Sequence, residues 1–179
     1  GSHLCEQIAS KEPESLVALD NFFIGKRSNL DAAKKIFPRL EIVECDACQK
    51  EKLFSVLKKG EFDMIFNLVT LPLPLSLSNP DKCFTGNAVS ALNLCEAQRA
   101  GLFGSLVHFS SSEVFGTAKK IPMGEEHPKT PLTPYAAGKL AADSIVSSYH
   151  STFGTEVRIV RPFNTYGPRQ SARAVIPTV

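Results

Sequence analysis

The chain has 179 residues, of which 43% are hydrophobic and 21% charged, as in an ordinary globular domain with a core. A net charge of +2 gives no reason to expect nucleic acid or an anionic membrane as a partner. The most apolar stretch, residues 64–77, contains Asn67, Pro72 and Pro74 and is too short to cross a bilayer. Because the N-terminus also lacks the layout of a signal peptide, we expect no membrane contact and a cytoplasmic location.

Five cysteines, an odd number without a secretion signal, are expected to be reduced thiols. Cys45 and Cys48 have the two-residue gap of a metal or redox pair, but no second pair follows at a usable spacing. We therefore expect no metal site. On the simpler reading, Cys45 ends a buried strand and Cys48 begins a helix.

Short apolar runs alternate with helical patterns along the chain. Strands are predicted over residues 16–20, 41–44, 64–67, 106–109 and 157–160, and helices over residues 48–58, 81–100 and 134–153. Runs this short and apolar are typical of strands covered on both faces, as in a parallel sheet. The alternation predicts an α/β fold, a doubly wound parallel sheet of the Rossmann type, in which ligands bind at the carboxyl ends of the strands.

Tyr135 and Lys139 lie four residues apart near the start of the helix predicted over 134–153, so their side chains share a face. An ammonium group beside a phenol stabilises the phenolate and lowers the pKa of the tyrosine. Such a tyrosine can remove a hydroxyl proton while hydride leaves the same carbon. Because this spacing alone also occurs on surface helices without function, the interpretation depends on its surroundings.

Three serines and a glutamate stand at the end of the strand predicted over 106–109. Ser110, Ser111, Ser112 and Glu113 follow it directly, at the edge where ligands bind. A run of serines can also be no more than a turn. Its combination with a proline-rich loop and a following Tyr-x-x-x-Lys is much rarer and favours a catalytic site.

Three motifs in a fixed order extend this pattern along the chain. They are Ser-Ser-Ser-Glu-Val-Phe-Gly (110–116), Pro-Tyr-Ala-Ala-Gly-Lys (134–139) and Arg-Pro-Phe-Asn-Thr-Tyr-Gly-Pro-Arg (161–169). Together they resemble the extended short-chain dehydrogenases/reductases of the NAD-dependent epimerase/dehydratase family. The stretch 170–178 is similar to the nucleotide-sugar dehydratases and epimerases of that family. The resemblance implies NAD as cofactor and a nucleotide-diphosphate sugar as substrate.

The resemblance also implies roles for the residues at matching positions. Ser111 takes the place of the catalytic serine or threonine that hydrogen-bonds the sugar 4-hydroxyl. Tyr135 matches the catalytic base, and Lys139 matches the residue that holds the nicotinamide ribose. Asn164 falls where the family contacts the diphosphate or the sugar, and Ser112 is expected to contact the substrate as well.

Asp20 and Asn21 stand at the end of the first predicted strand, where an acid can accept hydrogen bonds from the adenosine ribose. A carboxylate there disfavours a 2′-phosphate, so we expect NAD rather than NADP. Lys26 and Arg27 follow closely and weaken that preference.

Four further positions are expected to contact the cofactor. Gly1 matches the third glycine of the family's glycine-rich loop, with Asp20 at the expected distance, although Gly-Ser-His could equally be a cloning remnant. Asp46 falls near the adenine, Asn87 near the cofactor, and Pro162 beside the nicotinamide. Asp46 could instead cap a helix, and Asn87 could be a satisfied polar group that links a helix to a strand.

The expected organisation is an NAD-binding domain over residues 1–164, followed by the start of the substrate-binding region over residues 165–179. The family's first strand and most of its glycine-rich loop have no counterpart in this pattern, so we expect the fold to be truncated at both ends. Gly138 lies within a predicted helix, where it costs about 1 kcal/mol relative to alanine. We expect it to let the backbone approach a ligand.

The resemblance implies chemistry through a 4-keto sugar, in which Tyr135 takes the 4-hydroxyl proton while the C4 hydride passes to NAD. Glu113 would then act as an acid–base group in a 4,6-dehydratase, although relatives with this glutamate include 4-epimerases. A UDP-glucuronate decarboxylase-like enzyme is an alternative, and Glu113 could also merely cap a turn or pair with Lys139. A non-catalytic binding module and a reductase that releases NAD(P)H stay open as other classes.

The helices predicted over 81–100 and 134–153 carry apolar residues beyond one face, including Leu94, Leu140 and Ile145. In extended members of the family these two helices pair into a four-helix bundle between subunits. The resemblance therefore implies a homodimer.

Overall fold

The computed structural model describes residues 1–170, in two compact units that begin at Gly1 and at Phe54. Helix α3 (Lys50–Leu57) spans the boundary between them in the sequence. Part of the predicted substrate-binding region, residues 171–179, lies outside the described residues.

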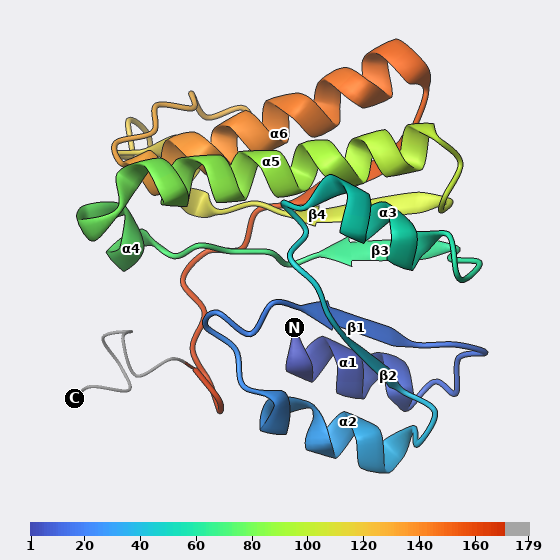
Figure 1. Cartoon of the computed structure of the whole chain (residues 1–179). Coiled ribbons are helices and arrows are strands. Elements are labelled where there is room, and N and C mark those ends of the chain that lie inside the picture. Colours follow the sequence, from blue (N-terminus) through green and yellow to red (C-terminus); the bar gives the residue numbers. More distant parts are fainter. Residues whose placement is uncertain (171–179) are drawn as a thin grey trace. The chain divides into compact units, whose positions relative to one another are not determined.

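The first unit is built on two parallel strands. It contains α1 (Ser2–Ala9), β1 (Val17–Asp20), the 3-10 helix η1 (Arg27–Leu30), α2 (Asp31–Ile36) and β2 (Glu41–Glu44). β1 pairs with β2 from Val17 opposite Glu41 to Asp20 opposite Glu44, so both carboxyl ends lie at one edge. Helices α1 and α2 lie beside this strand pair (Figure 1), and their apolar side chains form a core with it: Ala9, Leu30, Ala33, Phe37 and Leu40.

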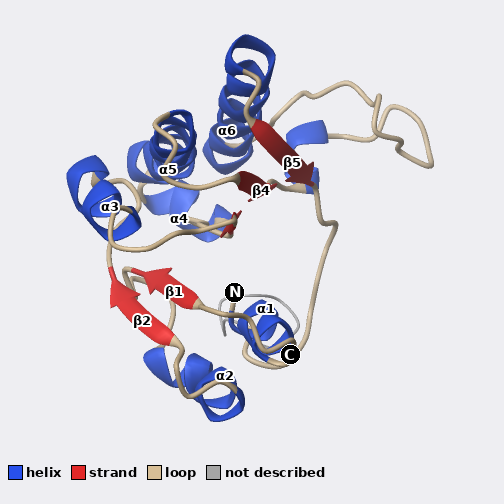
Figure 2. Cartoon of the chain, turned by 90° about the vertical axis from the view of Figure 1, so that its right-hand side faces the viewer, coloured by secondary structure: helices blue, strands red, loops and turns tan. Residues whose placement is uncertain are grey.

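The second unit holds a three-stranded parallel sheet in the order β3-β4-β5. Its elements are β3 (Met64–Asn67), α4 (Leu73–Ser78), α5 (Pro80–Arg99), β4 (Ser105–Phe109), η2 (Ser112–Phe115), α6 (Pro134–Phe153) and β5 (Glu156–Val160). Helices α5 and α6 lie side by side along one face of this sheet (Figures 1 and 2). The fold is therefore α/β with parallel strands, as predicted, although the ladders form two sheets among the described residues.

Local signals fix both ends of the long helices. Asn79 accepts a hydrogen bond from the Lys82 N–H at the start of α5, and Thr133 accepts one from the Ala136 N–H at the start of α6. Each cap is followed by a proline at the first helical position, where no N–H is needed. Gly154 ends α6 in the left-handed conformation. These caps explain why the predicted helix 134–153 has the bounds of α6.

Gly138 serves helix packing, which corrects the expectation that it lets the backbone approach a ligand. A Cβ atom at this position would lie 2.9 Å from the Phe84 carbonyl oxygen and 3.0 Å from the Phe84 Cα. Both atoms belong to the backbone of α5, so they cannot rotate away. The missing side chain therefore allows α6 to lie close against α5.

The strands are less evenly covered than their apolar runs suggested. Residues Ser105–His108 of β4, the central strand of its sheet, are buried, whereas burial alternates along β5. Met64 on β3 is also exposed. The expectation of strands covered on both faces is thus wrong for the edge strands, because helices cover an edge strand less completely than a central one.

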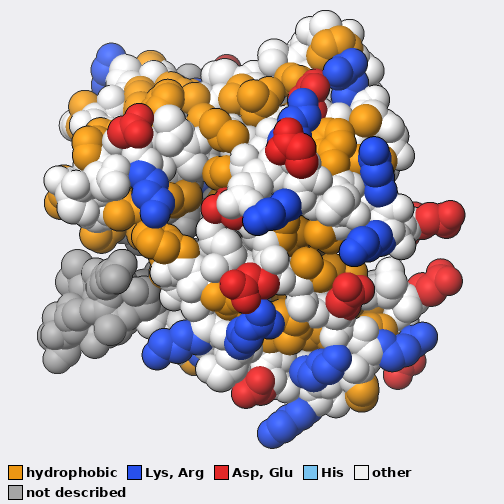
Figure 3. Space-filling view, viewed as in Figure 1, with side chains coloured by type: hydrophobic (Ala, Val, Ile, Leu, Met, Phe, Trp, Pro, Cys, Tyr) orange, Lys and Arg blue, Asp and Glu red, His pale blue; other side chains and the backbone are white. Residues whose placement is uncertain are grey.

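Other expectations from composition can be compared with the described residues. All five cysteines are free thiols, and no cluster of metal-ligating side chains occurs within residues 1–170. No helix in the described part of the chain is long and apolar enough to span a bilayer. On the face drawn in Figure 3, basic and acidic side chains are interspersed.

Candidate active site

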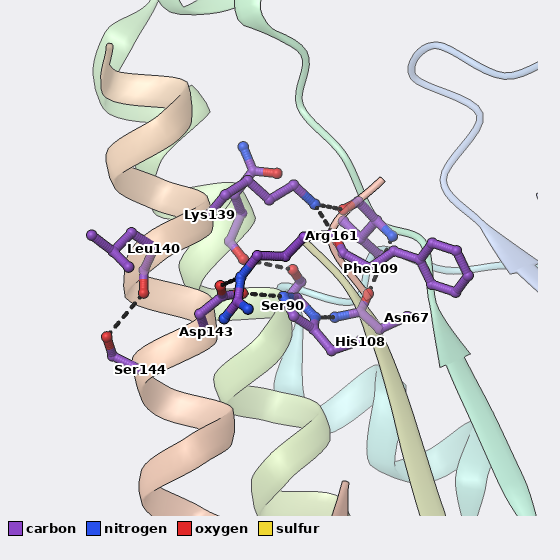
Figure 4. A network of polar contacts seen from close by, with 11 residues as sticks. Asn67, Ser90, His108, Phe109, Lys139, Leu140, Asp143, Ser144 and Arg161 are labelled. Carbon is purple, nitrogen blue, oxygen red and sulfur yellow. Dashed lines mark hydrogen bonds and ion pairs between the residues drawn. The ribbon is translucent and has the colours of Figure 1, made fainter. Parts of the chain in front are cut away.

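Lys139 is a buried cation at the carboxyl ends of two strands. Its Nζ donates hydrogen bonds to the Val69 carbonyl at 2.8 Å and to the Phe109 carbonyl at 3.0 Å (Figure 4). Val69 follows β3 and Phe109 ends β4. Although the side chain is only 1% exposed, its charge is therefore held by carbonyl dipoles at the edge where a doubly wound fold binds ligands.

Burial lowers the pKa of Lys139 to about 8, and the charges of Asp143 and Cys83 oppose this shift. The physical reason is that an ammonium group loses hydration in the protein interior, which favours its neutral form. At neutral pH the group is still mostly protonated. The protonated form of Lys139 is therefore favoured over the neutral form by only a small margin at neutral pH.

Tyr135 and Ser111 meet next to this lysine. Tyr135 lies one turn before Lys139 on α6, and Ser111, which follows β4 by two residues, is close enough to the phenol to lower its pKa. Burial raises the pKa of Tyr135, the charges of Glu113 and Cys83 add to the increase, and the Ser111 hydrogen bond opposes it. The expectation that Lys139 lowers this pKa is wrong for the structure, since burial dominates and Nζ points to carbonyl groups.

Glu113 lies in η2, close enough for its charge to raise the pKa of Tyr135. The Ser111 hydroxyl accepts a hydrogen bond from the Glu113 N–H at 3.2 Å, so Ser111 also caps this short turn. The Glu113 side chain itself is exposed, and within residues 1–170 no ion pair joins it to Lys139. The carboxylate is thus available on the same edge as the Tyr135 phenol.

The segments after β4 and β5 run together beyond the sheet. The Ser110 N–H donates to the Val160 carbonyl at 2.8 Å, and the Ser112 N–H donates to the Pro162 carbonyl at 3.1 Å. These bonds bring the predicted substrate contact Ser112 beside the predicted cofactor contact Pro162. Asn164, two residues further on, is exposed.

Aromatic contacts and a tight turn hold the segment that follows Glu113. The Phe115 ring stacks on Phe163, with ring centroids 6.4 Å apart. Gly116 has φ 65°, and a side chain there would collide with the Thr130 carbonyl oxygen. Only glycine fits both conditions, so the turn after η2 is fixed locally.

Asn87 links helix α5 to a neighbouring segment, a role that the sequence left open beside a cofactor contact. Its buried amide group donates to the carbonyls of Leu71 and Cys83 and accepts from the Leu71 N–H. These bonds tie α5 to the loop after β3. A contact between Asn87 and a cofactor stays a prediction.

The predicted adenosine-binding residues gather at one edge of the first unit. Asp20 Oδ1 accepts a hydrogen bond from the Phe22 N–H at 2.7 Å, and Asn21 Nδ2 donates to Asp46 Oδ2 at 3.1 Å. Asp46 Oδ1 also accepts from the Cys48 N–H at 2.8 Å, so it organises the turn before α3. The carboxyl ends of β1 and β2 thus present two carboxylates and an amide at the same edge.

Arg27, which could have favoured a 2′-phosphate, is engaged elsewhere. Its Nη2 lies 2.6 Å from Glu44 Oε2, and its guanidinium group lies 4.4 Å from the centroid of the Phe22 ring. Gly1 stands at the N-cap of α1 without a side-chain cap, which is compatible with the end of a glycine-rich loop. Its contact with a cofactor stays a prediction.

Sequence reasoning missed a buried polar group beneath the active-site lysine. It consists of Asn67, His108, Asp143 and Arg161, which come from β3, β4, α6 and the segment after β5 (Figure 4). Asp143 follows Lys139 by four residues, as Lys139 follows Tyr135. That repeat places all three on one helical face and was the available signal.

Comparisons with known proteins identify the family of the chain. The profile of the family described as GDP-mannose 4,6 dehydratase matches residues 1–179. UDP-glucuronic acid decarboxylase 6 of Arabidopsis thaliana is 33% identical over 96% of this chain and 49% of its own length. UDP-glucose 4-epimerase of Mycolicibacterium smegmatis is 31% identical over 95% of this chain and 54% of its own.

A solved dTDP-glucose 4,6-dehydratase from Streptomyces venezuelae with NAD bound superimposes with a TM-score of 0.91 at 30% identity. The match covers 99% of this chain and 56% of that one. The chain thus spans about half the length of these relatives. With the family profile matched from the first residue to the last, the chain belongs to the epimerase/dehydratase family of extended short-chain dehydrogenases/reductases.

Proposed function

We propose that this chain is the NAD-binding part of a nucleotide-sugar epimerase or dehydratase that works through a 4-keto sugar. The observation that carries the proposal is the placement of Ser111 beside the Tyr135 phenol, whose pKa it lowers, with Lys139 one helical turn further on. A hydroxyl, a phenol and a cation at the end of a central parallel strand are the groups needed to oxidise a sugar hydroxyl. In this proposal residues 1–164 form the NAD domain, and the substrate region begins at residue 165.

The residues present fit NAD at both of its ends. In the first unit, Asp20 and Asp46 offer carboxylate oxygens at one sheet edge, where the hydroxyls and the adenine of adenosine would be held. In the second unit, Lys139 Nζ is a donor that could serve the nicotinamide ribose, and Pro162 is partly exposed beside Ser112. When bound, oxidised NAD supplies the hydride acceptor, and its positive ring favours the phenolate form of Tyr135.

Tyr135 is the group that moves the proton of the sugar 4-hydroxyl. Ser111 orients that hydroxyl and stabilises the phenolate by hydrogen bonding, which is the direction in which it shifts the pKa of Tyr135. Lys139 adds a positive charge one turn away. Asn164 and Ser112, on the two adjoining segments, hold the sugar or the diphosphate.

Glu113 acts on the 4-keto sugar. The carbonyl at C4 acidifies the proton at C5, and a carboxylate near Tyr135 can remove that proton. In a 4,6-dehydratase the C5 proton and the C6 hydroxyl then leave as water, after which the hydride is returned to C6 and a proton is added at C5. In a 4-epimerase neither leaves, and the hydride returns to the other face of C4.

A uronate decarboxylase is the second candidate. It is favoured by the 33% identity with UDP-glucuronic acid decarboxylase 6 and by similar identities with its Arabidopsis homologues. A 4-keto uronate is a β-keto acid, so the bond between C5 and C6 breaks, carbon dioxide leaves, C5 takes up a proton, and the hydride then returns to C4. This route needs no acid to assist a leaving hydroxide, and Glu113 is the carboxylate that acts on the pKa of Tyr135.

The test supplies the full-length enzyme with UDP-, GDP- and dTDP-sugars, including UDP-glucuronate, and identifies the products by mass and NMR. We expect a new nucleotide sugar without net consumption of NAD, and none from Tyr135→Phe. Stoichiometric reduction of NAD would contradict the proposal, as would the lack of any product.

Glu113→Gln separates the candidates, because it keeps the size and hydrogen bonding of the side chain but removes the base. For a dehydratase, which needs a base for the C5 proton, we expect reduction of NAD followed by a stall at the 4-keto stage. Product formation at the parent rate would exclude Glu113 as that base and leave the 4-epimerase and the decarboxylase, which the identified product then separates.

We also propose that the enzyme is a cytoplasmic homodimer. Exposed apolar side chains along α5 and α6 support assembly: Phe84, Leu92 and Phe153. Leu94, which the sequence had suggested for this face, is buried, whereas Leu140 and Ile145 are partly exposed. Five free thiols are compatible with a reducing compartment.

A further inference from the structure

We propose that Asp143 is a positioning residue, which fixes the Pro162–Asn164 segment through Arg161 and compensates the charge of Lys139. The inference rests on the proposed function for its catalytic consequence. Its structural part rests on buried contacts that Asp143 makes behind the Tyr135–Lys139 pair. Asp143 does not belong to the three motifs that identify the family.

The first contact is a buried ion pair between Asp143 and Arg161. Arg161 Nε lies 2.9 Å from Asp143 Oδ2, and the two side chains are only 19% and 3% exposed. Arg161 directly precedes Pro162, whose carbonyl accepts the Ser112 N–H. The pair therefore joins the middle of α6 to the segment predicted to hold cofactor and substrate.

Arg161 extends this link toward the turn that holds Glu113. Its guanidinium carbon lies 5.9 Å from the centroid of the Phe115 ring, and Phe115 stacks on Phe163. A guanidinium group above an aromatic ring is attracted by the ring electrons. Asp143, Arg161, Phe115 and Phe163 thus form a continuous series of contacts.

The other oxygen of Asp143 faces His108. His108 Nε2 lies 3.6 Å from Asp143 Oδ1, and Asn67 Nδ2 lies 3.0 Å from His108 Nδ1 (Figure 4). Burial, with the charges of Lys139 and Arg161, lowers the pKa of His108 to about 3, so the ring is neutral. If the amide donates to Nδ1, the ring hydrogen is on Nε2 and points toward the carboxylate. At this distance neither His108 Nε2 nor Asp143 Oδ1 makes a hydrogen bond, so the neutral ring leaves the charge of Asp143 to Arg161 and Lys139.

Asp143 also provides negative charge near Lys139. The carboxylate raises the pKa of Lys139, against the larger effect of burial. The groups that face Lys139 are Asp143 and Tyr135 on its own helix, Cys83 on α5, His108 on β4 and Arg161 after β5. Asp143 pairs with Arg161, and its charge also acts on Lys139, so one buried carboxylate compensates two cations. Its removal leaves Arg161 without this partner and Lys139 without the charge that raises its pKa.

The test compares Asp143→Asn with a matched control in the NAD-loaded full-length enzyme. The control is Glu156→Gln, which breaks another arginine–carboxylate pair: Arg158 Nη2 lies 2.9 Å from Glu156 Oε1, with side chains 60% and 63% exposed. Because exposed pairs contribute little, the control should leave every readout unchanged. Asp143→Asn combined with Arg161→Gln removes both buried charges and serves if the single variant folds poorly.

Two readouts distinguish positioning from a merely structural role. The first is the pKa of Lys139, from NMR titration of lysine Cε resonances with assignment by Lys139→Met. It should fall by about one unit in Asp143→Asn, as expected for loss of a nearby opposite charge, and by less in the double variant, which also removes the Arg161 charge. The second readout is kcat and KM, measured separately for whichever nucleotide sugar the parent enzyme converts. A displaced segment should lower kcat by roughly tenfold to a hundredfold.

The outcomes also separate this inference from the proposed function. If no sugar is converted by the parent, the proposed function fails, and the NMR titration still decides whether Asp143 compensates Lys139. An unchanged Lys139 pKa in folded Asp143→Asn overturns the inference. The inference is also overturned if the variants lose thermal stability while kcat, KM and the pKa of Lys139 stay at parent values.

Discussion

The buried ammonium of Lys139 should make the stability of the chain depend on pH. Burial lowers its pKa to about 8, against 10.5 for an ordinary lysine. Between these values the unfolded chain keeps a proton that the folded chain has lost, so the free energy of unfolding rises with pH. At 1.36 kcal/mol per unit of pKa shift, the full effect is roughly 3 kcal/mol. About 2 kcal/mol of it should develop between about pH 7 and about pH 9.5.

Urea unfolding at these two pH values, followed by far-ultraviolet circular dichroism, measures the effect, because the chain has no tryptophan to report by fluorescence. Lys139→Met keeps most of the side-chain length but removes the titrating group. Burial raises the pKa of four thiols, which opposes the trend at alkaline pH in both proteins: Cys5, Cys45, Cys83 and Cys95. The difference between parent and variant therefore isolates Lys139. An equal pH dependence in both would refute the claim that Lys139 is a buried cation.

Three further predictions address the cofactor, the helix packing and the assembly. Asp20→Ala should weaken NAD more than NADP in calorimetric titrations, because it removes the carboxylate that disfavours a 2′-phosphate; equal losses would exclude Asp20 from the site. Gly138→Ala should destabilise the chain by about 1–2 kcal/mol, because the clash with the Phe84 backbone outweighs the gain in helix propensity, whereas Gly124→Ala, with open space around it, should change stability little. Light scattering of the full-length protein at micromolar concentration should give the mass of a dimer, and a monomeric mass would count against the proposed assembly.

The periodic features of the sequence carried over to the structure because they depend on local geometry. The strand 64–67 and the helix 134–153 have the predicted bounds, and the second is defined by Thr133, Pro134 and Gly154. The spacing of Tyr135 and Lys139 placed them one turn apart, and the position of Ser111 after a strand placed it at the same edge. Helices α1 and α2 were not predicted, although both are present in the first unit.

The features that sequence reasoning missed depend on tertiary packing. Nothing in the spacing of Tyr135 and Lys139 reveals that both are buried, and burial decides the direction of both pKa shifts. Gly138 was assigned to a ligand because its neighbour on α5 is known only once the helices are packed. The partners of Asp143 come from β4 and from the segment after β5, so no local motif could connect them.

The central claim is that the enzyme oxidises a nucleotide sugar at C4 and returns the same hydride to that sugar. The most direct measurement uses a substrate with deuterium at C4, with the label followed by mass spectrometry and NMR in the full-length enzyme. We predict that deuterium stays in the product sugar, that reduced NAD does not accumulate, and that Tyr135→Phe gives neither product nor transfer. Accumulation of deuterated, reduced NAD with an oxidised sugar would contradict the account and indicate an ordinary dehydrogenase.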